Sequence, residues 1–408
     1  MKISCPHCQG NIEVGEEWFG LEANCPHCGE TLLVPPAAPG HPSHSSGTND
    51  ETAPAGFAVP AEEPPPDSSS RKAWKKVADG VSQASGLEKL EGFDVSALFS
   101  KVFSKHSPEE IEERLTVGTR ETTPRLQDIE VGWPTPWIFC RVFAMSLAGA
   151  IGLYWAIGQF QNPFLIPGWI FIGCFGIPFA TLLFFFESNI LRNVSYYRVQ
   201  TVLILGGVLS LIFSLFLFDQ SFLDEWIGAI AAGPIEESGK LLAVVYFTRN
   251  WSKDHWTLNG LLFGAAVGTG FSAFESAGYV FVVFASGEEF DAETMMVLRA
   301  FLSPFTHTVW TAATAAALWR VKGKSKFKIA MLVDPRFLRV FVIIVILHSL
   351  WNSPLFIPPL GEMVGYFALR LAFGIVGWII VFLFIQAGLK EIQVAQAQLR
   401  NEPHVPPR

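Results

Sequence analysis

Three ionisable side chains interrupt an otherwise apolar run in the middle of the chain. The run is WIGAIAAGPIEESGKLLAVVYF, residues 226–247, and the three side chains are those of Glu236, Glu237 and Lys240. A charged side chain at the centre of a bilayer costs about 2.5–3.5 kcal/mol or more on insertion scales. Such a cluster inside a predicted membrane helix therefore indicates a function rather than ordinary packing.

Three further apolar runs each place one polar group at a similar depth. The groups are Glu275 in run 258–284, His307 in run 299–319 and His348 in run 337–356. With a rise of about 1.5 Å per helical residue, these groups and Glu236 lie roughly 12–15 Å from one end of their runs. Asn352 is one turn beyond His348 and shares its face. Four predicted helices therefore bring two glutamates and two histidines to one level near the middle of the membrane.

These residue types favour hydrolysis, by one of two routes. Two histidines and a glutamate, here His307, His348 and Glu275, can bind Zn2+ and leave one position open for water, while a second glutamate acts as general base. Alternatively, a buried carboxylate can activate water directly, without a metal. A lone intramembrane glutamate or histidine often only hydrogen-bonds a neighbouring helix, but four such groups at one depth indicate a functional site.

The two adjacent glutamates of the first run are not equivalent. On a helix they point about 100° apart, so only one of them needs to face the site. Lys240 is four residues from Glu236 and three from Glu237, and can neutralise either one. We expect it to pair with Glu236, whose spacing is the better one, and we take Glu236 as the general base with Glu237 as the alternative. Pro234 lacks a backbone N–H and is expected to kink the helix just before the pair.

Eight apolar spans must position these residues, so the chain is predicted to be an all-α polytopic membrane protein with a membrane domain at residues 137–389. The spans are 137–158, 165–186, 199–218, 226–247, 258–284, 299–319, 337–356 and 365–388. Three glycines at four-residue spacing in the fifth span, Gly260, Gly264 and Gly268, indicate close helix packing.

The charges of the loops predict how the spans are oriented. Alternate loops are basic, and the loop between the sixth and seventh spans carries seven Lys and Arg residues. The other loops carry none. An excess of basic residues marks the cytosolic side, so both termini and the tail at 390–408 are expected in the cytosol of a bacterial cell, with the spans in its cytoplasmic membrane.

The N-terminal third is polar and divides into three parts. Residues 1–34 contain C-x2-C-x16-C-x2-C, a spacing typical of a zinc ribbon. The four predicted Zn2+ ligands are Cys5, Cys8, Cys25 and Cys28. Two disulfides are the alternative, which a reducing cytosol disfavours. Residues 35–70 contain nine prolines and are predicted to be a disordered linker, and residues 71–136 are predicted to be a helical, amphipathic juxtamembrane segment in which Ser107 caps a helix.

Four motifs on successive spans carry a family resemblance. EESGK reads E-E-x-x-K, FSAFE reads F-x-x-x-E, His307 lies on the next span, and HSLWN reads H-x-x-x-N. In this order they resemble the PrsW family of intramembrane proteases, which is itself similar to the CAAX-prenyl endopeptidases. Ser276 stands where family members often have Asn after the glutamate of the second motif.

The resemblance implies hydrolysis of a peptide bond within the membrane. The substrate would be a membrane protein, such as an anti-sigma factor or another regulator. Carried over to this chain, the functional residues are Glu236, Glu237, Lys240, Glu275, His307 and His348, with Asn352 as an oxyanion donor. In the prenyl endopeptidases the first glutamate of the pair is the better candidate for the base, which also favours Glu236.

Two other functions compete with proteolysis. A proton- or ion-coupled transporter also places carboxylates and histidines at the midplane, although the spans show no inverted repeat. A membrane scaffold or sensor without activity would act through its zinc ribbon on a cytosolic protein partner, although all the expected site residues are present. The formal net charge of −8 gives no support to nucleic-acid binding. The lipid bilayer is the expected environment in each case.

Overall fold

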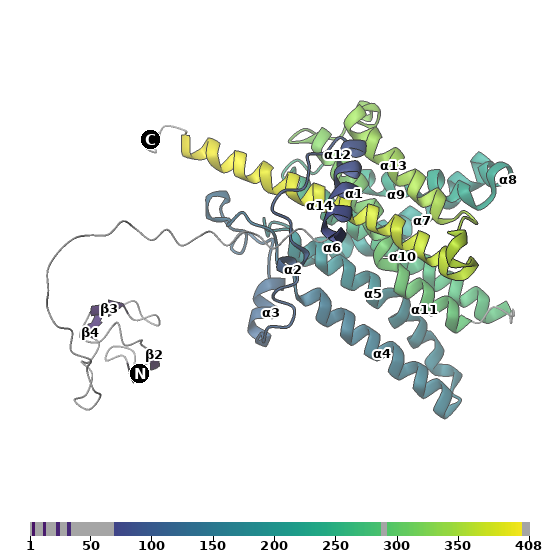
Figure 1. Ribbon diagram of the computed structural model, residues 1–408, viewed down its shortest axis with the longest axis horizontal. Coiled ribbons are helices and arrows are strands. Elements are labelled where there is room, and N and C mark those ends of the chain that lie inside the picture. The colour runs from purple at the N-terminus through teal and green to yellow at the C-terminus, as the bar shows by residue number, and fades with distance from the viewer. Residues whose placement is uncertain are drawn as a thin grey trace. The chain divides into compact units, whose positions relative to one another are not determined.

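The computed structural model describes residues 2–4, 11–13, 22–24, 31–33, 69–286 and 292–401 of the chain, which divides into two units, Met1–Pro65 and Pro66–Arg408 (Figure 1). In the first unit, two short antiparallel pairs of strands are described. They are β1 (Lys2–Ser4) with β2 (Asn11–Glu13), and β3 (Glu22–Asn24) with β4 (Thr31–Leu33). The four cysteines of the predicted zinc ribbon and residues 35–68 of the predicted linker lie outside the described residues, so the ribbon and the linker stay predictions; residues 69–70 begin a helix.

Among the described residues of the second unit, five helical stretches are long and apolar enough to cross a membrane. They are α4 (Ile138–Phe160), α5 (Ile166–Ser188) with the preceding turn η3 (Pro163–Leu165), the stretch α6 (Tyr196–Thr201), η4 (Val202–Gly206) and α7 (Gly207–Ser221), then α10 (Thr257–Ser286) and α14 (Glu362–Asn401). They correspond to five of the eight predicted spans. The described part of this unit is helical, as predicted, and its apolar helices are those of an integral membrane protein.

The other three predicted spans are interrupted or short helices, so eight continuous spans are not found among the described residues. They correspond to α8 (Leu223–Ile227), η5 (Gly228–Ala231) and α9 (Ala232–Thr248), to α11 (Ala292–Leu302), η6 (Ser303–Phe305) and α12 (His307–Lys322), and to α13 (Pro335–Trp351). The predicted kink at Pro234 is wrong. Pro234 lies in the first turn of α9, where a missing N–H removes no helical hydrogen bond.

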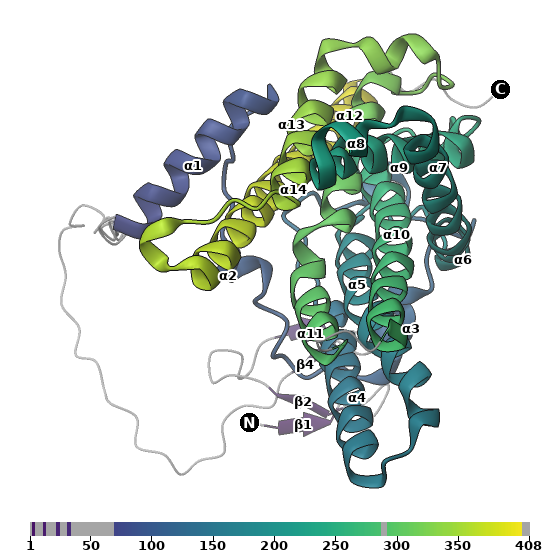
Figure 2. The same cartoon turned by 90° about the vertical axis from the view of Figure 1, so that its right-hand side faces the viewer.

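Helix α10 lies at the centre of the second unit, packed against α5, α7 and α12 (Figure 2). Three glycines on α10 face close neighbours. A Cβ at Gly264 would press on the backbone of Thr311, and one at Gly268 would press on the backbone carbonyl of His307. The close packing predicted from the glycine spacing is therefore confirmed, and it sets the short distance between α10 and the helix that carries His307.

The segment before α4 packs against α14. It contains α1 (Ser69–Ser85), α2 (Val95–Leu98), α3 (Pro108–Leu115) and the turn η2 (Leu126–Asp128). Ala78 of α1 is buried against Ile379 and Leu383 of α14, while Lys75 and Lys76 are exposed. Ser107 caps α3 as predicted, since its side chain accepts a hydrogen bond from the N–H of Glu110. Two further turns, η7 (Ile329–Val333) and η8 (Pro358–Leu360), precede α13 and α14.

Replacing two glycines of α10 separately tests the close packing. Gly264→Ala forces a methyl group against the backbone of α12 and should lower the free energy of unfolding by about 1–3 kcal/mol. Gly278→Ala is the matched control, because nothing lies within 4 Å of its added Cβ. It should be neutral or stabilising by up to about 1 kcal/mol. Thermal unfolding of the purified variants measures both effects, and equal midpoints would argue against the tight α10–α12 contact.

Candidate functional site

Five of the seven predicted site residues lie at or near helix ends, whereas Lys240 and Glu275 lie inside α9 and α10. Glu236 and Glu237 lie in the second turn of α9, and His307 is the first residue of α12. His348 lies in the last turn of α13, and Asn352 is the residue that caps that helix. Such positions let side chains of different helices converge, because each chain segment changes direction beside the site.

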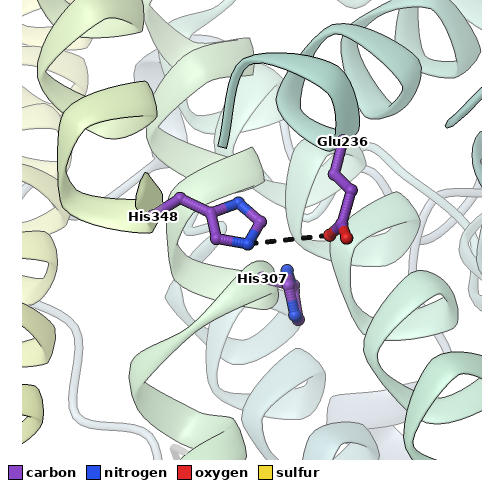
Figure 3. A group of neighbouring side chains, drawn as sticks. All are labelled: Glu236, His307 and His348. Carbon is purple, nitrogen blue, oxygen red and sulfur yellow. Dashed lines mark ion pairs between the residues drawn. The ribbon is translucent and has the colours of Figure 1, made fainter. Parts of the chain in front are cut away.

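Glu236, His307 and His348 converge on one point (Figure 3). One ligand atom from each residue lies within 4.8 Å of the others, and all three residues are buried. The Nε2 atom of His348 is 3.6 Å from Oε2 of Glu236, and the centres of the two imidazole rings are 5.0 Å apart. The convergence expected from their common depth is therefore found.

Glu237 and Lys240 lie behind this cluster rather than in it. The Nζ atom of Lys240 is fully buried and donates to Oε1 of Glu237 at 2.6 Å and to Nδ1 of His307 at 2.9 Å. The same Glu237 oxygen lies 2.8 Å from Nδ1 of His348. The expected pair between Lys240 and Glu236 is thus wrong, because Lys240 and Glu237 both point to the inner face of α9. Glu237 and Lys240 hold the two histidines in orientation.

Glu275 lies on the other side of His307, with an arginine partner that sequence reasoning missed. Its Oε2 atom is 3.2 Å from Nε2 of His307 and accepts a hydrogen bond from Arg299 Nη2 at 2.5 Å. Arg299 also donates from Nε to Ser276 Oγ at 3.0 Å. Ser276 therefore makes a polar contact of its own beside Glu275. The available signal was Arg299 itself, a cation at the start of an apolar run.

A cavity of about 1250 Å³ opens onto the cluster. Glu236, Glu275, Arg299, His307, His348 and Asn352 line it, whereas Glu237 and Lys240 do not. Apolar side chains of α7, α11 and α14 form part of the remaining wall, among them Leu215, Leu298 and Phe367. Glu236 is thus the member of the adjacent pair that faces the cavity.

The residues at this point fit a divalent metal ion. Two imidazoles and a carboxylate are a donor set of catalytic zinc sites. Oε2 of Glu236 is buried and has no hydrogen-bond partner in the described part of the chain, so it is available as a ligand. This set differs from the expected one, because Glu236 takes the place of Glu275, which is occupied by Arg299.

The hydrogen bonds at the two histidines set how each would meet a metal. Glu237 holds Nδ1 of His348, which leaves its Nε2 directed toward Glu236. His307 has partners on both nitrogens. Lys240 can only donate, so Nδ1 of His307 accepts, and its Nε2 carries the proton that Glu275 accepts. A metal at that nitrogen must displace the proton, as metal binding to protein ligands generally does.

Comparison with protein-family models matches residues 177–386, slightly more than half of the chain, to the PrsW family intramembrane metalloprotease. The matched region contains every site residue described above. No curated protein and no solved structure was found to be similar. The chain therefore belongs to the PrsW family of intramembrane metalloproteases, and the resemblance seen in its four motifs is confirmed.

Removing the buried ammonium group tests how the cluster is held. Lys240→Met leaves the carboxylate of Glu237 without its cation, and breaking a buried ion pair from one side costs about 3–5 kcal/mol of unfolding free energy. Lys240→Met combined with Glu237→Gln removes both charges and should recover part of that loss. Lys326→Met, at an exposed lysine, is the control. Thermal unfolding in detergent measures the four proteins, and equal stability of the two single variants would show that the pair contributes nothing.

Proposed function

We propose that this member of the PrsW family cleaves a peptide bond of a membrane protein, with Glu236, His307 and His348 around the attacking water. The observation that carries the proposal is the convergence of these three side chains, from three different helices, at the inner wall of a cavity. An anti-sigma factor or another single-pass regulator is the class of substrate that we propose.

Glu236 is proposed as the general base. Glu236 lines the cavity, and its Oε2 atom is not engaged by any hydrogen-bond donor among the described residues, so the carboxylate can accept a proton from water. Glu237 suits this role less well. Its side chain is fully enclosed, and one of its oxygens already holds both Lys240 and His348. We propose that Glu237 instead fixes the ring orientation of His348.

The histidines and Asn352 are proposed to hold the reactants. A divalent metal held by His307, His348 and one carboxylate oxygen of Glu236 would supply a Lewis acid that polarises the scissile carbonyl and makes water more acidic, and the second oxygen of Glu236 would remain to take the proton. Asn352 lines the same cavity and makes no side-chain hydrogen bond within residues 73–286 and 295–400, so its amide is free to donate to the developing oxyanion. Glu275, held by Arg299, keeps the His307 ring in place.

Removing the proposed base should abolish cleavage. Glu236→Gln keeps the size of the side chain but cannot take a proton, so the cleavage rate should fall by at least about 10²-fold. Cleavage of a co-expressed single-pass membrane substrate, at matched amounts of inserted enzyme, measures the rate. Glu225→Gln, on the exposed helix α8, is the matched control and should cleave normally. Near-normal cleavage by both Glu236→Gln and Glu237→Gln would mean that the proposed site is wrong.

Metal content separates the two proposed zinc sites. The purified full-length protein should hold one zinc ion in the ribbon and one at the cavity. His348→Ala removes a cavity ligand and should lower the zinc content by one ion per chain. The double variant Cys25→Ser, Cys28→Ser should lose the zinc ion of the ribbon and keep the zinc ion at the cavity. Elemental analysis provides the measurement, and an unchanged zinc content in His348→Ala would exclude a metal held by that residue.

A further inference from the structure

One arginine lies fully buried inside the last membrane helix. Arg370 of α14 is 1% exposed, and it is the sole charged residue of the apolar run 365–388. A guanidinium group in this position is costly unless polar partners compensate it. Its role is absent from the four family motifs and from the proposed chemistry above, so its partners show what it does.

Three hydrogen bonds of Arg370 go to backbone carbonyls of a single segment. Its Nε donates to the carbonyl of Trp351 at 3.2 Å, its Nη2 donates to that of Ser353, and its Nη1 donates to that of Leu355. The ring of Tyr366 lies against the guanidinium plane, with 3.4 Å between Cζ and the ring centre. The planar fork of an arginine spreads its donors over several acceptors in a way that a lysine cannot.

The segment needs these donors because it follows the end of a helix. Helix α13 ends at Trp351, and the last carbonyls of a helix have no partner within it. Irregular backbone at membrane depth persists only where protein groups satisfy its polar atoms. Arg370 therefore donates the hydrogen bonds that water would donate at an exposed helix end.

Asn352 lies between two of the held carbonyls. The carbonyl before it, from Trp351, and the carbonyl after it, from Ser353, both accept from Arg370. Two fixed carbonyls on either side of one residue restrict its backbone torsions, and hence the direction of its side chain. The side chain of Asn352 lines the cavity, and the backbone N–H of Asn352 donates to the carbonyl of His348.

We propose that Arg370 is a positioning residue for the reaction, which acts by fixing the segment 351–355 so that the Asn352 amide points at the reacting carbonyl. The proposal rests on the proposed function, in which Asn352 stabilises the oxyanion. Arg370 itself does not line the cavity, so it does not contact the substrate. Arg370 holds the backbone on both sides of Asn352, so we place its effect on the rate at that residue.

The test is a double-mutant cycle between Arg370 and Asn352. Arg370→Lys keeps a positive charge but cannot bridge three carbonyls, so kcat should fall about 10–100-fold, the range expected from a misplaced catalytic group, with KM little changed. In the Asn352→Ala background, the same Arg370→Lys change should lower kcat less than about twofold, because the group that it positions is already absent. Equal fold-losses in both backgrounds would overturn the proposal.

A matched control on the same helix separates positioning from general damage to α14. Trp378 donates from Nε1 to the carbonyl of Pro304 at 2.9 Å, in the turn before His307. Trp378→Phe removes that one hydrogen bond, and its effect on kcat should be the same with and without Asn352→Ala. If Trp378→Phe shows the same non-additivity as Arg370→Lys, the coupling is a property of the whole helix and the proposal fails.

A second measurement does not depend on activity. Amide hydrogen exchange over residues 349–357 should be faster in Arg370→Lys than in the unaltered protein, and unchanged in Trp378→Phe. Unchanged exchange in Arg370→Lys would overturn the positioning role even if kcat falls. Absence of cleavage by the unaltered protein, or normal cleavage by Glu236→Gln, would instead refute the proposed function, so the two failures are distinguishable.

Discussion

The pairing of one buried ammonium group determines the arrangement of the site. Lys240 is inaccessible to solvent, so its charge must be balanced by protein groups alone. Glu237 supplies the balancing charge, and His307 accepts a further hydrogen bond from the same nitrogen. Because Glu237 also holds His348, a single ion pair connects α9, α12 and α13. Glu236, whose Oε2 atom accepts no hydrogen bond in the described part of the chain, is then free to face the cavity.

Three of the predicted spans are interrupted, and these interruptions help to bring the site residues together. A continuous helix carries its side chains outward at fixed intervals, whereas a helix end lets the chain turn toward a neighbour. His307 begins α12 directly after a turn that contains Pro304, and His348 lies in the last turn of α13. Each break exposes backbone groups that need partners inside the membrane. Helix α14 supplies some of them, through Trp378 at the first break and Arg370 at the second.

The sequence was sufficient to locate the cluster but not to arrange it. Depth along each span follows from residue counting, which is why the convergence of Glu236, His307 and His348 was predictable. The rotation of each helix about its axis does not follow from residue counting. The prediction that Lys240 pairs with Glu236, four residues away, was therefore wrong, and its partner is Glu237, three residues away. The partners of Arg370 could not be predicted from the sequence either. They are backbone carbonyls 15–19 residues away, and every residue has a backbone carbonyl, so the residue types do not indicate which ones are used. The zinc ribbon remains a prediction from cysteine spacing.

The length of α14 has a consequence for the membrane around the protein. Its apolar run, residues 365–388, spans about 36 Å, somewhat more than the roughly 30 Å of a typical hydrocarbon core. Near its C-terminal end, Gln386 and Gln396 bind backbone groups of the segment before α4, and near its start Arg370 holds the segment with Asn352. An apolar stretch that is longer than the hydrocarbon core can respond to a change of thickness by tilting. Because α14 is bound at both ends, a change in its tilt also moves the segment that carries Asn352. The position of Asn352 therefore depends on the thickness of the surrounding membrane.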